Sequence, residues 1–192
     1  MLPLKLVPLG YEQKFPSNKE LGLHLQKKER TEIPSDAILS KVKHAITKSI
    51  IEFEIFFGLT KSESIKLPAY SIMDDHIMIY RKIAYNSYDR IIPITEEQQR
   101  KVLNKRMQII NNYGGRNCLL QVASFQELSN LYRSELAILN IKGHSSFRKL
   151  YAKNRFTDLI QNCKRAEAIN ILQKELGLTS NIFLKEWINE QD

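Results

Sequence analysis

The sequence has few cysteines and no long apolar run, and both shortages exclude whole classes of protein. Its two cysteines, Cys118 and Cys163, form neither a disulfide framework nor the spacing of a metal site, which favours a reducing setting. No apolar run approaches the roughly 20 residues that a membrane-spanning helix needs. The apolar start of the chain holds Pro3 and Pro8 and makes a poor signal peptide. We therefore expect a cytoplasmic protein without a membrane segment.

What the sequence does have is positive charge. The 192 residues suit one domain with an extra arm, and the apolar content of 43% is enough for a hydrophobic core. The formal net charge is +8, and an excess of lysine and arginine attracts phosphate groups. The charge therefore favours nucleic acid as a partner. The alternative is a basic protein whose positive charge has no role in binding a partner.

Turn residues and apolar periodicity divide the chain. Residues 1–34 are predicted to form an irregular N-terminal arm, because prolines punctuate them. From Ser35 or Asp36 apolar residues recur at helical period up to Gly58, where a helix can end. Further helices are predicted over 62–67, 96–111, 124–139, 145–161, 165–176 and 180–190, with Thr95 and Gln98 forming a capping box.

Between these helices the periodicity changes to that of strands. Ile77 to Ile83 and Ile91 to Ile94 are strand-like, and a turn-like segment separates them. The fold class that follows is mixed α/β and mainly α. It consists of a helical domain over 35–192 with one small antiparallel sheet, a hairpin at about residues 77–94.

Three short segments, and a fourth downstream, follow one another in a recognisable order. The first is Gly58-Leu59-Thr60-Lys61-Ser62-Glu63, followed by Leu67, and the second is Arg90-Ile91-Ile92-Pro93-Ile94. The third, running from Gly143 to Ala152, includes Arg148 and opens a helix. The fourth is Leu176-Gly177-Leu178-Thr179-Ser180. Together they resemble the motifs of the catalytic domain of tyrosine recombinases, the phage integrase family. The resemblance covers most of 35–190 and implies that fold.

The chain departs from the family's pattern where the family carries its chemistry. Arg148 stands at the position of the second catalytic arginine. Five other positions differ: Thr60 replaces an arginine, Tyr88 a lysine, Ser145 and Leu178 histidines, and Trp187 the nucleophilic tyrosine. No tyrosine follows Tyr151 in the sequence.

These departures imply a domain that has lost catalysis. In the family, a tyrosine hydroxyl attacks a DNA phosphate, and preorganised donors stabilise the charged transition state. Tryptophan has an N–H group but no nucleophilic oxygen, and leucine donates no hydrogen bond. We therefore predict a pseudo-enzyme with no catalytic residue, no metal site and no cofactor.

The resemblance and the charge together predict DNA binding. The predicted partner is double-stranded DNA, and the predicted role is that of an accessory or regulatory factor of a mobile element, plasmid or phage. The residues expected to contact DNA are Lys82, Arg90, His144, Arg148, Lys149, Lys153 and Arg155. A solvated helix face is the alternative explanation for Lys149 and Lys153.

Two alternative functions stay open. The chain could be a protein–protein interaction module that keeps the fold but not DNA binding. Its last predicted helix is amphipathic around Phe183 and Trp187, which would suit a homo-oligomer or a partner recombinase. It could also be an atypical active recombinase with relocated residues: Lys82, His144, Arg148, and Tyr151 or Tyr132.

Overall fold

The apolar periodicity of residues 35–57 predicts one continuous helix, but the structure has two helices there. The computed structural model describes residues 35–141 and 145–189, so the predicted arm over 1–34 and His144 lie outside the described residues. Helix α1 covers Ser35–Lys41 and α2 covers Ala45–Phe57. Between them, the carboxylate of Glu135 accepts hydrogen bonds from the backbone N–H groups of Lys43 and His44, at 2.5 and 2.8 Å. The break is therefore stabilised from a distant part of the sequence.

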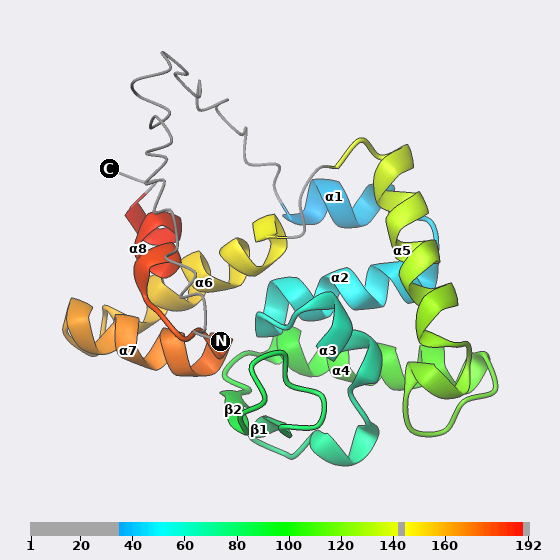
Figure 1. Ribbon diagram of the computed structural model, residues 1–192, viewed down its shortest axis with the longest axis horizontal. Coiled ribbons are helices and arrows are strands. Elements are labelled where there is room, and N and C mark those ends of the chain that lie inside the picture. Colours follow the sequence, from blue (N-terminus) through cyan, green and yellow to red (C-terminus); the bar gives the residue numbers. More distant parts are fainter. Residues whose placement is uncertain (1–34, 142–144, 190–192) are drawn as a thin grey trace, which may run out of the picture. The chain divides into compact units, whose positions relative to one another are not determined.

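Helix α2 is the buried centre of the helical domain. Ile50, Ile51, Phe53 and Phe57 are fully buried in it. It packs against α3 (Lys61–Lys66), α4 (Glu97–Asn112), α5 (Phe125–Ile138) and α6 (Ser145–Leu159). Figure 1 shows α2 between α5 and a group made of α6, α7 (Arg165–Leu176) and α8 (Ile182–Asn189).

The sheet of the described residues is a single antiparallel pair. Strand β1 covers His76–Ile79 and β2 covers Arg90–Pro93, with Ile77 opposite Ile92. Ile77 and Ile92 are fully buried, because alternate residues of a strand face the core. The predicted class is thus confirmed as a mainly helical domain with eight α-helices and a small two-stranded sheet in the described part. The first strand is shorter than predicted, since Ile83 lies in the turn.

Helix α4 begins one residue later than its predicted capping box implies. The amide oxygen of Gln99 accepts hydrogen bonds from the backbone N–H groups of Thr95 and Glu96, at 2.7 and 3.1 Å. The amide nitrogen of Gln99 donates to the carbonyl of Phe56 at 2.8 Å. The glutamine that caps α4 therefore also fixes it against α2.

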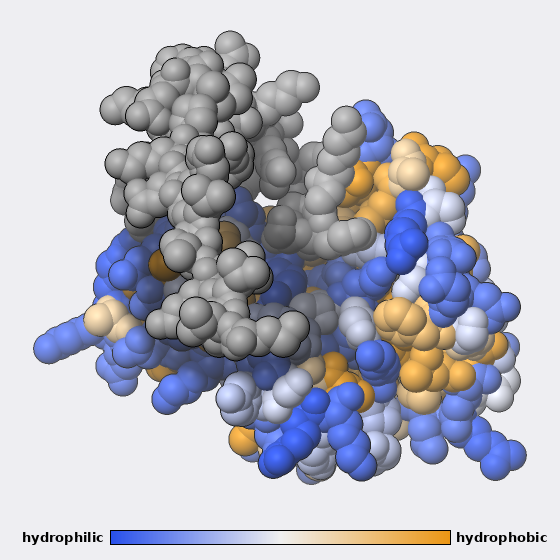
Figure 2. Space-filling view, viewed as in Figure 1, coloured by the Kyte–Doolittle hydropathy of each residue, from blue (hydrophilic) through white to orange (hydrophobic). Residues whose placement is uncertain are grey.

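Two apolar clusters meet at α2. One joins the sheet to α4, α6, α7 and α8, and the other joins α1, α4, α5 and the short 3-10 turn Leu119–Gln121. Phe56 packs against both clusters, so they form one core. Figure 2 shows a largely hydrophilic face with apolar side chains over the end of α5, where Ile138 is exposed. Within the described ranges, no helix has the length and apolarity that a membrane crossing requires.

Candidate functional site

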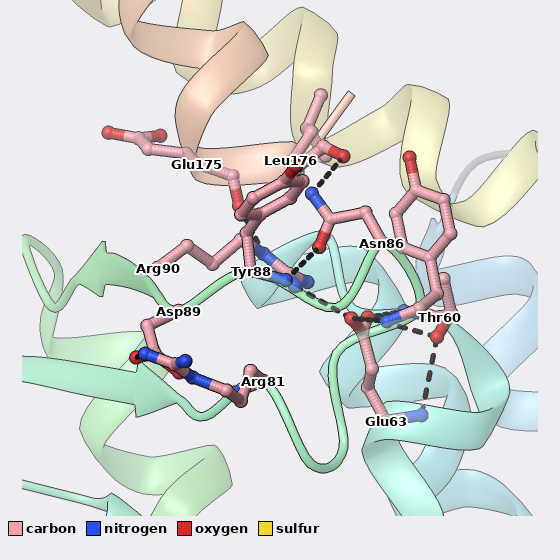
Figure 3. A network of polar contacts seen from close by, with 12 residues as sticks. Thr60, Glu63, Arg81, Asn86, Tyr88, Asp89, Arg90, Glu175 and Leu176 are labelled. Carbon is pink, nitrogen blue, oxygen red and sulfur yellow. Dashed lines mark hydrogen bonds and ion pairs between the residues drawn. The ribbon is translucent and has the colours of Figure 1, made fainter. Parts of the chain in front are cut away.

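The four motif segments meet through the hydrogen bonds of two arginines, and Figure 3 shows one of these, Arg90, with the residues around it. Arg148, from the third segment, donates from Nε to the carbonyl of Gly58 at 2.8 Å and from Nη2 to the carbonyl of Leu176 at 2.6 Å. Arg90, from the second segment, donates from Nε to the carbonyl of Glu175 at 3.0 Å. One arginine therefore ties the first segment to the fourth, and the other ties the hairpin to the end of α7.

A buried ion pair lies at the middle of this network. Nη1 of Arg90 lies 2.7 Å from Oε1 of Glu63, and both side chains are almost fully buried. The same oxygen accepts a hydrogen bond from the backbone N–H of Tyr85 at 3.1 Å. Burial by itself raises the pKa of the Glu63 carboxyl, but the hydrogen bond and charge of Arg90 outweigh it and hold that pKa below its ordinary value. Glu63 is therefore ionised at neutral pH.

Thr60, which the resemblance aligns with an arginine of the recombinase family, has a structural role here. Its hydroxyl accepts from the backbone N–H of Glu63 at 3.2 Å, and Oε2 of Glu63 accepts from the N–H of Thr60 at 2.8 Å. These reciprocal bonds are a capping box at the start of α3. The Thr-x-x-Glu spacing in the sequence is a signal for such a box.

Two motif glycines permit the close approach of these segments. Gly58 has φ +62°, and a Cβ on it would lie 2.6 Å from side-chain atoms of Tyr151 and Leu176. Gly177 has φ +65°, and its Cβ would crowd Asn86 and Arg90. A side chain at either position would meet both backbone strain and a clash. The glycines of the first and fourth segments are thus explained by packing.

A cleft of about 700 Å³ opens between the turn of the hairpin and α7. Tyr88 and Leu178, which the resemblance aligns with a lysine and a histidine of the recombinase family, both line it. The other lining residues are Asn86, Asp89, Arg90, Ile91, Asn170, Gln173, Lys174 and Gly177. The guanidinium of Arg90 is buried against Glu63, so Lys174 is the exposed cation of this lining, and with the side-chain amides it can attract an anion or a polar ligand.

The predicted basic cluster on α6 is less accessible than a phosphate-binding face requires. Arg148 and Lys149 are half-buried, and Lys153 is only 8% exposed. Arg155 forms an ion pair with Glu175, its Nη2 lying 3.0 Å from Oε1. The alternative explanation of a solvated helix face therefore does not hold for Lys153, and most of the cluster contacts other parts of the protein. Helical spacing could not indicate this, because Glu175 lies on another helix.

The remaining candidates lie in three places. Lys82 is exposed in the hairpin turn, away from the α6 cluster. Trp187 and Leu178 are half-buried and pack against the same apolar cluster. His144 lies outside the described residues. Among the residues that the structure describes, no three metal-binding side chains gather into a site.

The two tyrosines of the relocated-enzyme alternative have buried side chains. Tyr132 donates from its hydroxyl to Oε2 of Glu54 at 2.6 Å, and Tyr151 donates to Oε2 of Glu175 at 2.7 Å. Burial and the adjacent carboxylates raise the pKa of both hydroxyls above the ordinary value. A neutral hydroxyl in the core is a poor nucleophile for a DNA phosphate.

Comparisons of the chain with protein-family models, curated proteins and solved structures find no match. The function of the site is therefore argued from its own residues and from the motif resemblance.

Proposed function

We propose that this chain is a DNA-binding protein related to the tyrosine recombinase catalytic domain, without recombinase chemistry. It acts as an accessory or regulatory factor, of the kind that a mobile element, plasmid or phage would encode. The observation that carries the proposal is the convergence of the motif segments on Arg148 and on the Glu63–Arg90 pair. Chance similarity of short segments far apart in sequence gives no reason for them to meet.

The cleft beside α7 is the surface that we assign to the DNA backbone. Lys174 is exposed in this lining, and Asn170 offers a neutral amide donor to phosphate oxygens. The amides of Asn86 and Gln173 each donate one N–H to a backbone carbonyl, at 2.8 and 3.2 Å, and keep a second N–H for a ligand. Asp89 is the only acidic residue of the lining, and its carboxylate is bound by Arg81 at 3.1 Å.

The loss of catalysis follows from the side chains at the nucleophile position and in the core. Trp187 has no oxygen with which to form a phosphodiester to the protein. The hydroxyls of Tyr132 and Tyr151 are bonded to the buried side chains of Glu54 and Glu175. We therefore expect no covalent protein–DNA adduct from a nicked suicide duplex. A band of such an adduct on a denaturing gel would contradict the assignment as a pseudo-enzyme.

Binding is tested by fluorescence anisotropy of a labelled duplex over a range of salt. We expect saturable binding at low salt, with log K falling linearly against log salt. Lys174→Ala should lower the slope by about 1, the value for one lost phosphate contact. Lys164→Ala is the matched control, since Lys164 is an exposed lysine at the other end of α7. Absence of duplex binding at low salt would refute the proposal.

A second function is favoured by one observation on α8. Ile182 is 63% exposed and its neighbour Phe183 is 60% exposed, and such apolar side chains are typical of contacts between proteins. In this alternative, the chain is an interaction module that binds a second copy of itself or an active recombinase. Light scattering separates the two functions: Phe183→Asp should reduce the mass in solution only if α8 mediates self-association.

A further inference from the structure

A second hollow is lined by residues of the hairpin turn and has a different chemistry from the cleft. Its volume is about 330 Å³. It is lined by Pro68, Tyr70, Tyr80, Arg81, Lys82, Ile83 and Asp89, and we call it the tyrosine hollow. Of these residues only Asp89 also lines the cleft. No motif of the recombinase resemblance includes the two tyrosines.

The tyrosines of this hollow present aromatic surface to solvent. Tyr70 is 69% exposed and Tyr80 is 38% exposed. Their ring centroids lie 6.3 Å apart with the ring planes tilted by 45°. This is the spacing of a direct aromatic pair, so the rings contact each other and leave their outer faces open. A planar ligand would therefore stack on the pair and would not enter between the rings.

Both tyrosines stand on backbone that is fixed by hydrogen bonds. The N–H of Ala69 donates to the carbonyl of Asn117 at 2.7 Å, which anchors the short turn carrying Tyr70. The carbonyl of Tyr80 accepts from the N–H groups of Ile83 and Ala84, at 2.9 and 3.0 Å. The aromatic pair is thus already placed, and ligand binding would order little additional chain.

Two cations and one carboxylate surround the pair. Asp89 binds Arg81 twice, through the backbone N–H at 2.5 Å and the guanidinium at 3.1 Å. Figure 3 shows the Arg81–Asp89 ion pair in the hairpin turn. The adjacent Lys82 is exposed and lines the same hollow. Since Asp89 balances one of the two cations, the hollow carries a net positive charge that complements phosphate.

We propose that the tyrosine hollow binds an unpaired nucleotide of single-stranded DNA, with the base stacked on the Tyr70–Tyr80 pair and its phosphate near Lys82. Aromatic faces beside a basic side chain are the elements from which single-strand sites are built. The volume lies at the lower end of ligand pockets and suits one planar base. A base inside a duplex has both faces covered by its neighbours, so the hollow selects an unpaired one.

This inference goes beyond duplex binding by the cleft and does not need it. It adds a site at which a flipped, frayed or single-stranded base would be held next to the bound backbone. The expected preference is for single strands of any sequence, because every base offers a π-face.

The test measures anisotropy of labelled oligothymidylate and of a fully paired hairpin duplex at low salt. We expect Tyr70→Ala to weaken oligothymidylate binding about 5- to 150-fold, the range for one lost base stack, and to leave duplex binding unchanged. Tyr70→Phe should bind as the wild type, since it keeps the ring. Tyr113→Ala is the matched control, because Tyr113 is a tyrosine that is 48% exposed outside the hollow.

Each outcome separates this inference from the proposed function. Loss of oligothymidylate binding in Tyr70→Ala and Tyr80→Ala, but not in Tyr113→Ala, supports the site even if the duplex does not bind. Equal oligothymidylate affinity in all variants, or none in the wild type, overturns it even if the duplex binds. Binding of polyglutamate in a Tyr70-dependent manner, without oligothymidylate binding, would assign the hollow to an acidic polypeptide and also overturn it.

Discussion

Two buried glutamates on neighbouring helices have opposite ionisation. Glu63 in α3 and Glu54 in α2 are at most 1% exposed. Glu63 is bonded to the guanidinium of Arg90, and its pKa lies below the ordinary value. Glu54 accepts from the hydroxyl of Tyr132, and burial raises its pKa to about 8. At neutral pH one is therefore a carboxylate and the other a neutral acid.

The difference shows that a direct charged hydrogen bond decides the ionisation state, and a more distant charge does not. Arg148 lowers the pKa of Glu54 by its charge, but its guanidinium donates hydrogen bonds to the backbone carbonyls of Gly58 and Leu176. Without a bonded cation, desolvation dominates at Glu54. The region around Glu63 is thus fixed by ionic bonds, whereas the region around Glu54 responds to pH.

The largest effect is expected from removing the charge of Glu63. Glu63→Met leaves the guanidinium of Arg90 buried without its carboxylate, which should lower the free energy of unfolding by roughly 3–5 kcal/mol. Urea denaturation at pH 7 measures this loss. The double variant Glu63→Met/Arg90→Met should recover part of it, because it also removes Nη2 of Arg90, a buried nitrogen with no partner in the described part of the chain.

The same pair gives a defined response to acid. Since the pKa of Glu63 is lower in the folded protein than in the unfolded chain, its contribution to stability is present above the unfolded pKa and is lost as the pH falls through the folded one. Glu63→Met should not show this acid-dependent loss. A variant within about 1 kcal/mol of the wild type at pH 7 would mean that the pair is not a source of stability.

The next effect concerns the pH dependence caused by Glu54. Its folded pKa of about 8 lies above the value of 4.5 in the unfolded chain, so its contribution is fully present below pH 4.5 and is lost as the pH rises towards 8. Over that window the wild type should lose at most about 1.4 kcal/mol of unfolding free energy per pH unit from this group.

Glu54→Gln is the matched variant for that measurement. A glutamine still accepts from the Tyr132 hydroxyl but does not titrate. We expect urea denaturation at pH 5, 6.5 and 8 to show a smaller loss of stability with rising pH in Glu54→Gln than in the wild type. Parallel curves for the two proteins would place the titrating group elsewhere.

Local signals in the sequence predict much of this fold and less of its polar interior. The helix ends at Gly58 and Gly177 and the hairpin follow from turn residues and periodicity, and the structure confirms them. The break before α2 could not be predicted, because Glu135 lies far away in sequence. The Glu175–Arg155 ion pair could not be predicted from the sequence either, because its two residues lie on different helices.

A smaller effect is expected from Arg148, whose positive charge interacts with the side chains of both Glu54 and Glu63. Arg148→Met leaves the carbonyls of Gly58 and Leu176 without these donors and should cost about 2 kcal/mol. It should also raise the pKa of Glu54, because the cation that favours the ionised form is gone. Denaturation at several pH values measures both changes. Arg148→Lys should restore the pKa but not the stability, since lysine cannot bond both carbonyls in the same geometry.

The smallest effect tests the capping box that holds Glu63. Thr60→Ala removes a hydroxyl that accepts from the N–H of Glu63 and donates to its carboxylate at 2.9 Å, and it should cost roughly 1–2 kcal/mol. Ser124→Ala removes the same bonds from the box at the start of α5, where the partner Glu127 is exposed, and about 0.5–1 kcal/mol is expected. Thr60→Ser should be near the wild type. If Thr60→Ala cost no more than Ser124→Ala in urea denaturation, the threonine would cap α3 without stabilising the Glu63–Arg90 pair.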